Sequence, residues 1–186
     1  FEFVREKELA GRLSAAASVY YYRLSGMIEG VLVSEAALQY RNVRDSWVSG
    51  MDVEVKGRAA EWLELGASFS VQEARFRQGK DLPNSPDRLA QLRAAVPLFR
   101  DRLSVAMATR YQSARMTSIR DEVAGVVLAD LTVNANRLHP KLDLQFGIRN
   151  LANRRYYDPV SPEHSIPTLL RAGRTAFLRI DWRPGE

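Results

Sequence analysis

Alternation of apolar and polar side chains organises most of this chain. Between Trp62 and Gln72, every second residue is apolar and the residues between them are polar or glycine. The apolar set is Leu63, Leu65, Ala67, Phe69 and Val71, and the other set is Glu64, Gly66, Ser68, Ser70 and Gln72. Successive side chains of a strand point to opposite faces, so the pattern predicts a ribbon with one apolar and one polar face. A closed barrel of such ribbons satisfies its backbone hydrogen bonds within a bilayer.

The same alternation recurs along the chain. We expect strands at about 1–8, 13–22, 37–59, 62–72, 88–98, 102–113, 122–138, 141–151 and 174–183. Residues 24–36 lack regular alternation and are expected to form a loop. Short connections are expected near 9–11, 60–61, 98–101 and 139–140, and long ones near 25–36, 76–87, 114–121 and 152–171. Outer-membrane barrels have short periplasmic turns and long extracellular loops, so the sequence predicts an all-β, antiparallel transmembrane β-barrel.

Strand length favours a membrane barrel over a water-soluble sheet. A segment such as Leu63–Val71 spans roughly 30 Å at ~3.3 Å per residue. When tilted, it crosses most of an apolar band that is about 25 Å tall. Soluble barrels and sandwiches turn their apolar face inward and use shorter strands, of about 5–6 residues. A soluble β-rich binding module remains as an alternative, as does a smaller, self-contained porin or adhesion barrel.

Composition narrows the partners. The chain has 186 residues, no cysteine, and 27 Lys+Arg against 22 Asp+Glu, which gives a net charge of +5. The arginines are spread along alternating strands, which disfavours a nucleic-acid-binding module and indicates a polar lining with solvated loops. No apolar run reaches the roughly 18 residues of a spanning helix. The chain begins at Phe1 without a methionine or a signal segment, and we interpret it as part of a longer protein.

Catalytic patterns are not apparent in the sequence. Only two histidines occur, His139 and His164, and no Ser/His/Asp arrangement or phosphate-binding glycine loop accompanies them. The carboxylates Asp52 and Glu54 alternate with apolar residues, which indicates a place on the polar face of a strand. We therefore predict that the protein is not an enzyme and has no cofactor or bound metal of its own.

Three short motifs point to a family. Leu38-Gln39-Tyr40-Arg41-Asn42-Val43 precedes Gly50-Met51-Asp52-Val53-Glu54, and Leu82-Pro83-Asn84-Ser85-Pro86 precedes a strand. The third motif, at the penultimate strand, is Gly147-Ile148-Arg149-Asn150-Leu151-Ala152-Asn153-Arg154-Arg155-Tyr156-Tyr157. In this order and spacing they resemble the C-terminal part of the barrel of a TonB-dependent outer-membrane receptor. That resemblance implies a Gram-negative outer-membrane protein with a twenty-two-stranded barrel. Residues 1–186 would then be about its last nine strands, without the plug domain and the earlier strands.

The resemblance also implies a function and partners. The function would be TonB-dependent uptake of a scarce nutrient, such as a ferric siderophore, haem or a cobalamin-like compound. This segment would supply barrel wall, lumen and extracellular loops. The partners would be the protein's own N-terminal plug, the TonB complex reached through the missing N-terminal region, lipid and lipopolysaccharide, and a metal-chelate ligand, with no nucleic acid.

Candidate contact residues fall into three groups. Lumen-facing arginines, which could meet an anionic ligand or the plug, are Arg93, Arg110, Arg149 and Arg179. Pairing of each arginine with a nearby Asp or Glu across strands is the alternative interpretation. Loop candidates for ligand contact are Tyr156, Tyr157 and His164, and candidates for the membrane interface are Trp62, Tyr111 and Trp182.

Overall fold

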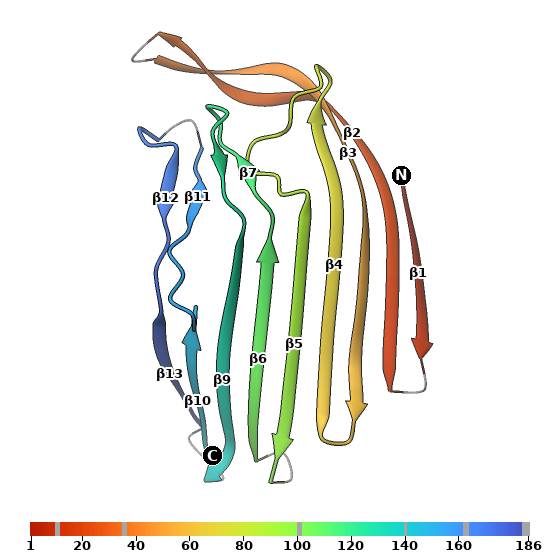
Figure 1. Ribbon diagram of the computed structural model, residues 1–186, viewed down its shortest axis with the longest axis vertical. Helices are drawn as coiled ribbons and strands as arrows, with labels where there is room; N and C mark the ends of the chain where they lie inside the picture. Colours follow the sequence, from red (N-terminus) through yellow and green to blue (C-terminus); the bar gives the residue numbers. More distant parts are fainter. Residues whose placement is uncertain (10–11, 35–36, 100–101, 140, 162–163, 184–186) are drawn as a thin grey trace.

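The structure of the protein, a computed structural model, describes residues 1–9, 12–34, 37–99, 102–139, 141–161 and 164–183. These residues form strands and connecting segments, and no helix among them is long and apolar enough to cross a membrane. Nine strands make one antiparallel sheet in the order β1-β2-β3-β4-β5-β6-β9-β10-β13 (Figure 1). Their bounds are β1 Glu2–Leu9, β2 Leu13–Ser34, β3 Ala37–Ala60, β4 Leu63–Phe76, β5 Arg88–Leu98, β6 Leu103–Gln112, β9 Val126–His139, β10 Leu142–Arg149 and β13 Thr175–Trp182. The prediction of an all-strand, antiparallel fold is confirmed.

Four short strands lie in the connections between these long ones. They are β7 Arg115–Met116, β8 Glu122–Val123, β11 Tyr157–Pro159 and β12 Thr168–Leu170. They form two separate ladders, β7 with β8 and β11 with β12. Both ladders lie at one end of the sheet (Figure 1). The connections at the opposite end are short, as the sequence predicts. Residues 10–11, 100–101 and 140, which fall in three of the expected short turns, lie outside the described residues.

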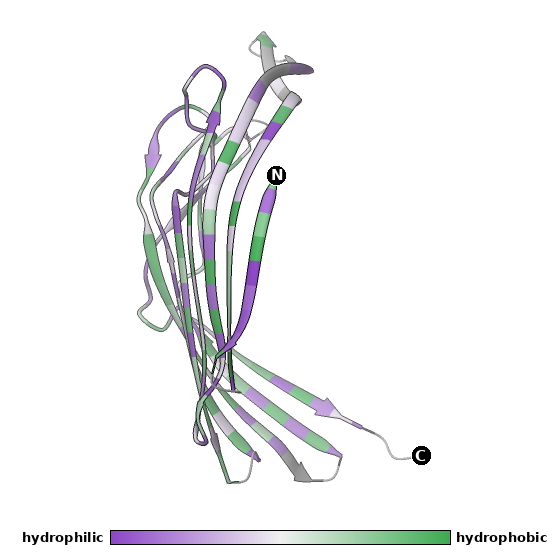
Figure 2. Ribbon diagram, turned by 90° about the vertical axis from the view of Figure 1, so that its right-hand side faces the viewer, coloured by the Kyte–Doolittle hydropathy of each residue, from purple (hydrophilic) through white to green (hydrophobic). Residues whose placement is uncertain are grey.

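The apolar face of the sheet is not covered by any other segment that the structure describes. In the side view, apolar and polar bands alternate along the strands of a bowed wall (Figure 2). Large apolar side chains on one face are exposed, for example Phe69 at 44% and Leu178 at 63%. Others on this face are Met51, Val53, Val71, Leu92, Met107, Val127, Phe146 and Ile180. Among the described residues, few apolar side chains are buried: Ala74, Phe76, Ala95, Ala106, Val123, Leu128 and Pro159. This distribution fits a wall facing lipid and does not fit the core of a soluble globule.

The expected loop at 24–36 is wrong over residues 24–34, and residues 35–36 lie outside the described residues. β2 continues to Ser34 and pairs with β3 from Ser34↔Ala37 onward, with register shifts between Leu24 and Met27 and between Leu32 and Ser34. Gly26 takes a left-handed φ of 66° within the first shift, and its N–H donates to Asp45 Oδ1 at 3.3 Å. The hairpin extends past the ends of the neighbouring strands (Figure 1). Apolar and polar residues alternate along a strand only where its two faces have different surroundings. A hairpin beyond the barrel wall has solvent on both sides, so its sequence lacks this alternation.

Smaller differences concern strand ends. The segment expected as one strand over 122–138 is divided into β8 and β9, because Ala124 and Gly125 leave the ladder. Trp62 lies in the β3–β4 turn and not in the strand. β4 runs on to Phe76, because its last residues pair with the part of β3 that begins at Ser46. Cross-strand partners therefore decide these boundaries.

Candidate functional site

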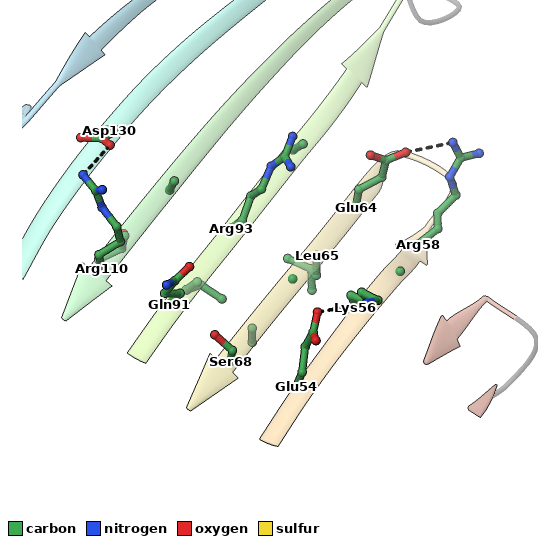
Figure 3. Close-up of a pocket in the computed structure, with 17 residues that line it drawn as sticks. Glu54, Lys56, Arg58, Glu64, Leu65, Ser68, Gln91, Arg93, Arg110 and Asp130 are labelled. Atoms are coloured by element: carbon green, nitrogen blue, oxygen red, sulfur yellow. Dashed lines mark hydrogen bonds and ion pairs between the residues drawn. The ribbon is translucent and has the colours of Figure 1, made fainter. Parts of the chain in front are cut away.

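The polar face of the sheet forms a hollow that extends across strands β3, β4, β5, β6 and β9. Its volume is about 670 Å³, and its polar lining includes Glu54, Lys56, Arg58, Glu64, Arg93 and Arg110. Side chains two residues apart along a strand lie on the same face of a sheet, and so do directly opposite cross-strand partners. By this rule the six side chains all lie on one face. Figure 3 shows them projecting from neighbouring strands into the same space. Such a surface suits hydrated or anionic molecules and the polar surface of another protein segment.

Most charges of this face are paired within the sheet. Arg110 Nη2 lies 2.9 Å from Asp130 Oδ2, and Arg58 Nη2 lies 3.2 Å from Glu64 Oε1 (Figure 3). Nearer the last strand, Arg179 Nε lies 2.9 Å from Asp181 Oδ2. For Arg110 the structure therefore shows the cross-strand pairing that was the alternative interpretation, whereas Arg179 pairs with an aspartate of its own strand. Exposed pairs of this kind each contribute about 0–1 kcal/mol, so they chiefly hold the side chains in place.

Arg93 differs from its neighbours. It projects from β5 into the hollow (Figure 3), and it has no ion-pair partner among the described residues. Its cross-strand neighbours are Gly66 on β4 and Ala108 on β6, which leave open space around its guanidinium. This group is available to a carboxylate or phosphate that enters the lumen.

Arg149 is held by an aromatic ring. Its guanidinium carbon lies 5.0 Å from the centroid of the Phe177 ring, within the range of a cation–π contact. Phe177 is directly opposite Gly147 in the β10–β13 ladder, where a Cβ atom would collide with the ring. A glycine on β10 thus makes room for Phe177, and Phe177 supports Arg149.

The candidate loop residues lie at the long-connection end. Tyr156 and Tyr157 line a second hollow of about 510 Å³, together with residues 123–127 and the two arginines Arg154 and Arg155. Tyr157 opens β11 and is 48% exposed. His164 is exposed, and its backbone N–H donates to the Ser161 carbonyl at 3.1 Å. The structure brings the two tyrosines together but does not place His164 among the residues lining that hollow.

The candidate interface aromatics occupy both ends of the wall. Trp62 in the β3–β4 turn and Trp182 at the end of β13 are 62% and 60% exposed, and both lie toward the short-turn end. Tyr111 lies near the other end of β6 and projects from the apolar face, opposite Val127. Their role as anchors at the membrane interface stays a prediction.

Two asparagine-containing motifs shape the long-connection end. Asn150 follows β10 with a φ of 51°, and its amide bonds both the N–H and the carbonyl of Arg154, at 2.9 and 2.8 Å. Asn84, in the Leu82–Pro86 motif, has a φ of 55° and accepts a hydrogen bond from Arg115 Nη1 at 2.8 Å. Sequence reasoning noticed both asparagines as parts of motifs. It missed Arg115, because a single arginine in a connection carries no pattern.

Comparison with known proteins identifies the family. The model of the family described as "TonB dependent receptor-like, beta-barrel" matches residues 6–151. The chain belongs to this family. The TonB-dependent receptors are transport proteins of the Gram-negative outer membrane and not enzymes. The match therefore confirms the resemblance and the predicted localisation. No curated protein matches the chain.

Solved structures of such receptors share the fold. The ferric-catecholate import receptor Fiu of E. coli K12 has a TM-score of 0.72 and 18% identity over 97% of this chain. BauA, the ferric preacinetobactin receptor of Acinetobacter baumannii, has a TM-score of 0.76 and 15% identity, and the copper transporter OprC has 0.80 and 17%, each also over 97% of the chain. The chain spans 27%, 28% and 30% of these three proteins, respectively.

Proposed function

We propose that the intact protein is a TonB-dependent active transporter for a metal chelate or a similar scarce nutrient, such as a ferric siderophore, haem or a cobalamin-like compound. The observation that carries the proposal is that the chain matches the barrel of this family and forms a wall with one apolar face and one charged face. Structural neighbours named as ferric-siderophore receptors and a copper transporter support a metal-containing cargo. Residues 1–186 would be the C-terminal part of the barrel, about nine of twenty-two strands, and would supply wall, lumen and extracellular loops.

The partners follow from the same proposal. An N-terminal plug would fill the lumen, and the TonB complex would act through it. Lipid and lipopolysaccharide would contact the apolar wall, with Trp62, Tyr111 and Trp182 at its two interfaces. Arg93 is the lumenal group best suited to an acidic side chain of the plug or to an anionic cargo, because the described residues leave its charge unpaired. Three other arginines, Arg110, Arg149 and Arg179, are held by contacts within the wall. They would act on the plug or the cargo through their positive electrostatic potential.

The proposed capture of cargo involves the loops. Tyr156 and Tyr157, with the neighbouring arginines, form an aromatic and cationic surface at the long-connection end. Such a surface suits a planar, anionic chelate, because aromatic faces stack on planar groups and arginine pairs with oxyanions. His164 would contact cargo from the adjoining loop.

Uptake measurements test the proposal. The intact protein is produced in a Gram-negative strain without its own ferric receptors, and accumulation of radioactive iron from a ferric catecholate chelate is followed. A copper chelate is tested in parallel. We expect accumulation that disappears when TonB is deleted. Accumulation independent of TonB would instead favour a porin, and recovery of the protein in the soluble fraction would favour a soluble binding module.

A further inference from the structure

A buried arginine lies among the loops at the long-connection end. Arg115, in β7, has a side chain only 6% exposed. A buried charge of this kind is stabilised only when an opposite charge and hydrogen bonds satisfy it. The surroundings of Arg115 should therefore account for every donor of its guanidinium.

Its partners come from three separate connections. Nη1 donates to Asn84 Oδ1 at 2.8 Å, in the connection between β4 and β5. Nη2 donates to Asp158 Oδ1 at 2.8 Å and to the Tyr157 carbonyl at 3.3 Å, in the connection between β10 and β13. Arg115 itself belongs to the connection between β6 and β9.

The remaining donors face Gln112. With its side-chain amide turned so that the oxygen faces the guanidinium, Gln112 accepts from Nε at 3.1 Å and from Nη1 at 3.0 Å. All five N–H donors of Arg115 then have an acceptor. Lysine offers three donors on one nitrogen and cannot reach these directions together.

A second arginine meets the same carboxylate from the outside. Arg171 Nε lies 3.1 Å from Asp158 Oδ2, but its side chain is 49% exposed. Solvent screens this outer pair far more than the inner one. The two arginines thus share one partner and differ in burial, which makes Arg171 a control for Arg115.

We propose that Arg115 is a positioning residue that joins three extracellular connections into one preformed rim. Backbone bonds support the same unit, since the Asn84 N–H donates to the Met116 carbonyl at 2.8 Å. The bond to the Tyr157 carbonyl fixes the start of β11 and hence the tyrosine surface. The capture of cargo by this rim rests on the proposed function. The role of Arg115 in organising the rim is independent of that function.

Hydrogen exchange in the intact receptor tests the rim. The protein is reconstituted in lipid nanodiscs, and amide exchange is measured by mass spectrometry for peptides covering 77–87, 113–125 and 150–174. In Arg115→Gln we expect exchange in all three regions to rise together, by about a hundredfold, because the hydrogen bonds from the buried guanidinium that join the three connections are lost. Peptides from β4 and β6 should not change. Arg115→Lys should resemble Arg115→Gln, and Arg171→Gln should change exchange less than about threefold.

Each other result overturns the proposal. Unchanged exchange in Arg115→Gln would show that the rim holds without this arginine. A change confined to 113–125 would show that the three connections are not coupled. Uniform acceleration, including β4 and β6, would assign Arg115 to global stability instead of positioning. Binding of a ferric catecholate chelate is measured in the same samples. If the wild-type receptor does not bind the chelate, the proposed cargo is wrong while the exchange result still decides the role of Arg115.

Discussion

Phe69 and Ser68 are neighbours in β4 with opposite surroundings. Phe69 is 44% exposed on the apolar face, whereas Ser68 lines the lumenal hollow opposite Glu54. The same chemical change at the two positions therefore meets lipid in one case and a polar, partly acidic wall in the other. This contrast is a direct test of the facing assignment.

We expect Phe69→Lys to destabilise the intact barrel by about 2–4 kcal/mol, the cost of a cation near the bilayer midplane. Ser68→Lys should change stability by less than about 1 kcal/mol, because water and Glu54 accommodate its charge. Denaturant titration of the barrel in lipid bilayers measures both. Equal losses would contradict the assignment of the two faces.

Gly147 shows how a missing side chain can position a charge. A Cβ atom at this position would collide with the Phe177 ring on which Arg149 stacks. We expect Gly147→Ala to cost about 1–3 kcal/mol by overpacking. Gly66 is the control, because a Cβ atom there would meet nothing within 4 Å, and Gly66→Ala should stay within about 0.5 kcal/mol.

The same titration reads out both alanine variants. The double variant Gly147→Ala/Phe177→Ala should lose less stability than the sum of the two single variants, because the collision between the Cβ atom and the ring disappears. The double-mutant cycle should therefore be clearly non-additive. Strictly additive losses would mean that the ring and the glycine do not interact.

At the scale of elements, the turn after β10 depends on a single asparagine. Asn150 is 5% exposed, has a left-handed φ of 51°, and closes the turn through its side-chain bonds to Arg154. Two contributions are combined here: tolerance of positive φ and the side-chain hydrogen bonds. Glycine at this position retains the first and loses the second.

We expect Asn150→Gly to cost about 1–3 kcal/mol, from the loss of hydrogen bonds to buried polar groups. Asn150→Ala should cost more, because alanine adds the strain of a left-handed backbone. The measurement is the unfolding free energy of the intact barrel, with amide exchange at 150–156 to localise the effect. A smaller loss for alanine than for glycine would contradict this account of the turn.

Elements also show where sequence reasoning stops. β5 matches its expected range, 88–98, because both of its faces have distinct surroundings along its full length. The last part of β2, from residue 24 to 34, was expected to be a loop, because beyond the wall no difference between lipid and lumen imposes alternation. This part is held to β3 by cross-strand hydrogen bonds, and pairing between distant residues leaves little trace in the local sequence.

For the whole molecule, the sheet combines an uncovered apolar face with free edges. Among the described residues, β1 and β13 each have a neighbouring strand on one side only. Exposed edges and apolar faces both promote association in water. We expect residues 1–186, produced alone, to form large aggregates in buffer without detergent. Sedimentation velocity distinguishes these from the monomer that a soluble binding module would give.

The sequence by itself determined most of the two-faced strands, the long connections near 76–87, 114–121 and 152–171, and the family. These features follow from local side-chain chemistry, because each strand must present one face to lipid and one to the lumen. Only the tertiary structure decided which charges are paired: it leaves Arg93 without a carboxylate partner among the described residues, and it buries Arg115 between three connections. Such contacts join residues distant in sequence, so their energies depend on the register and packing of strands that no local pattern records.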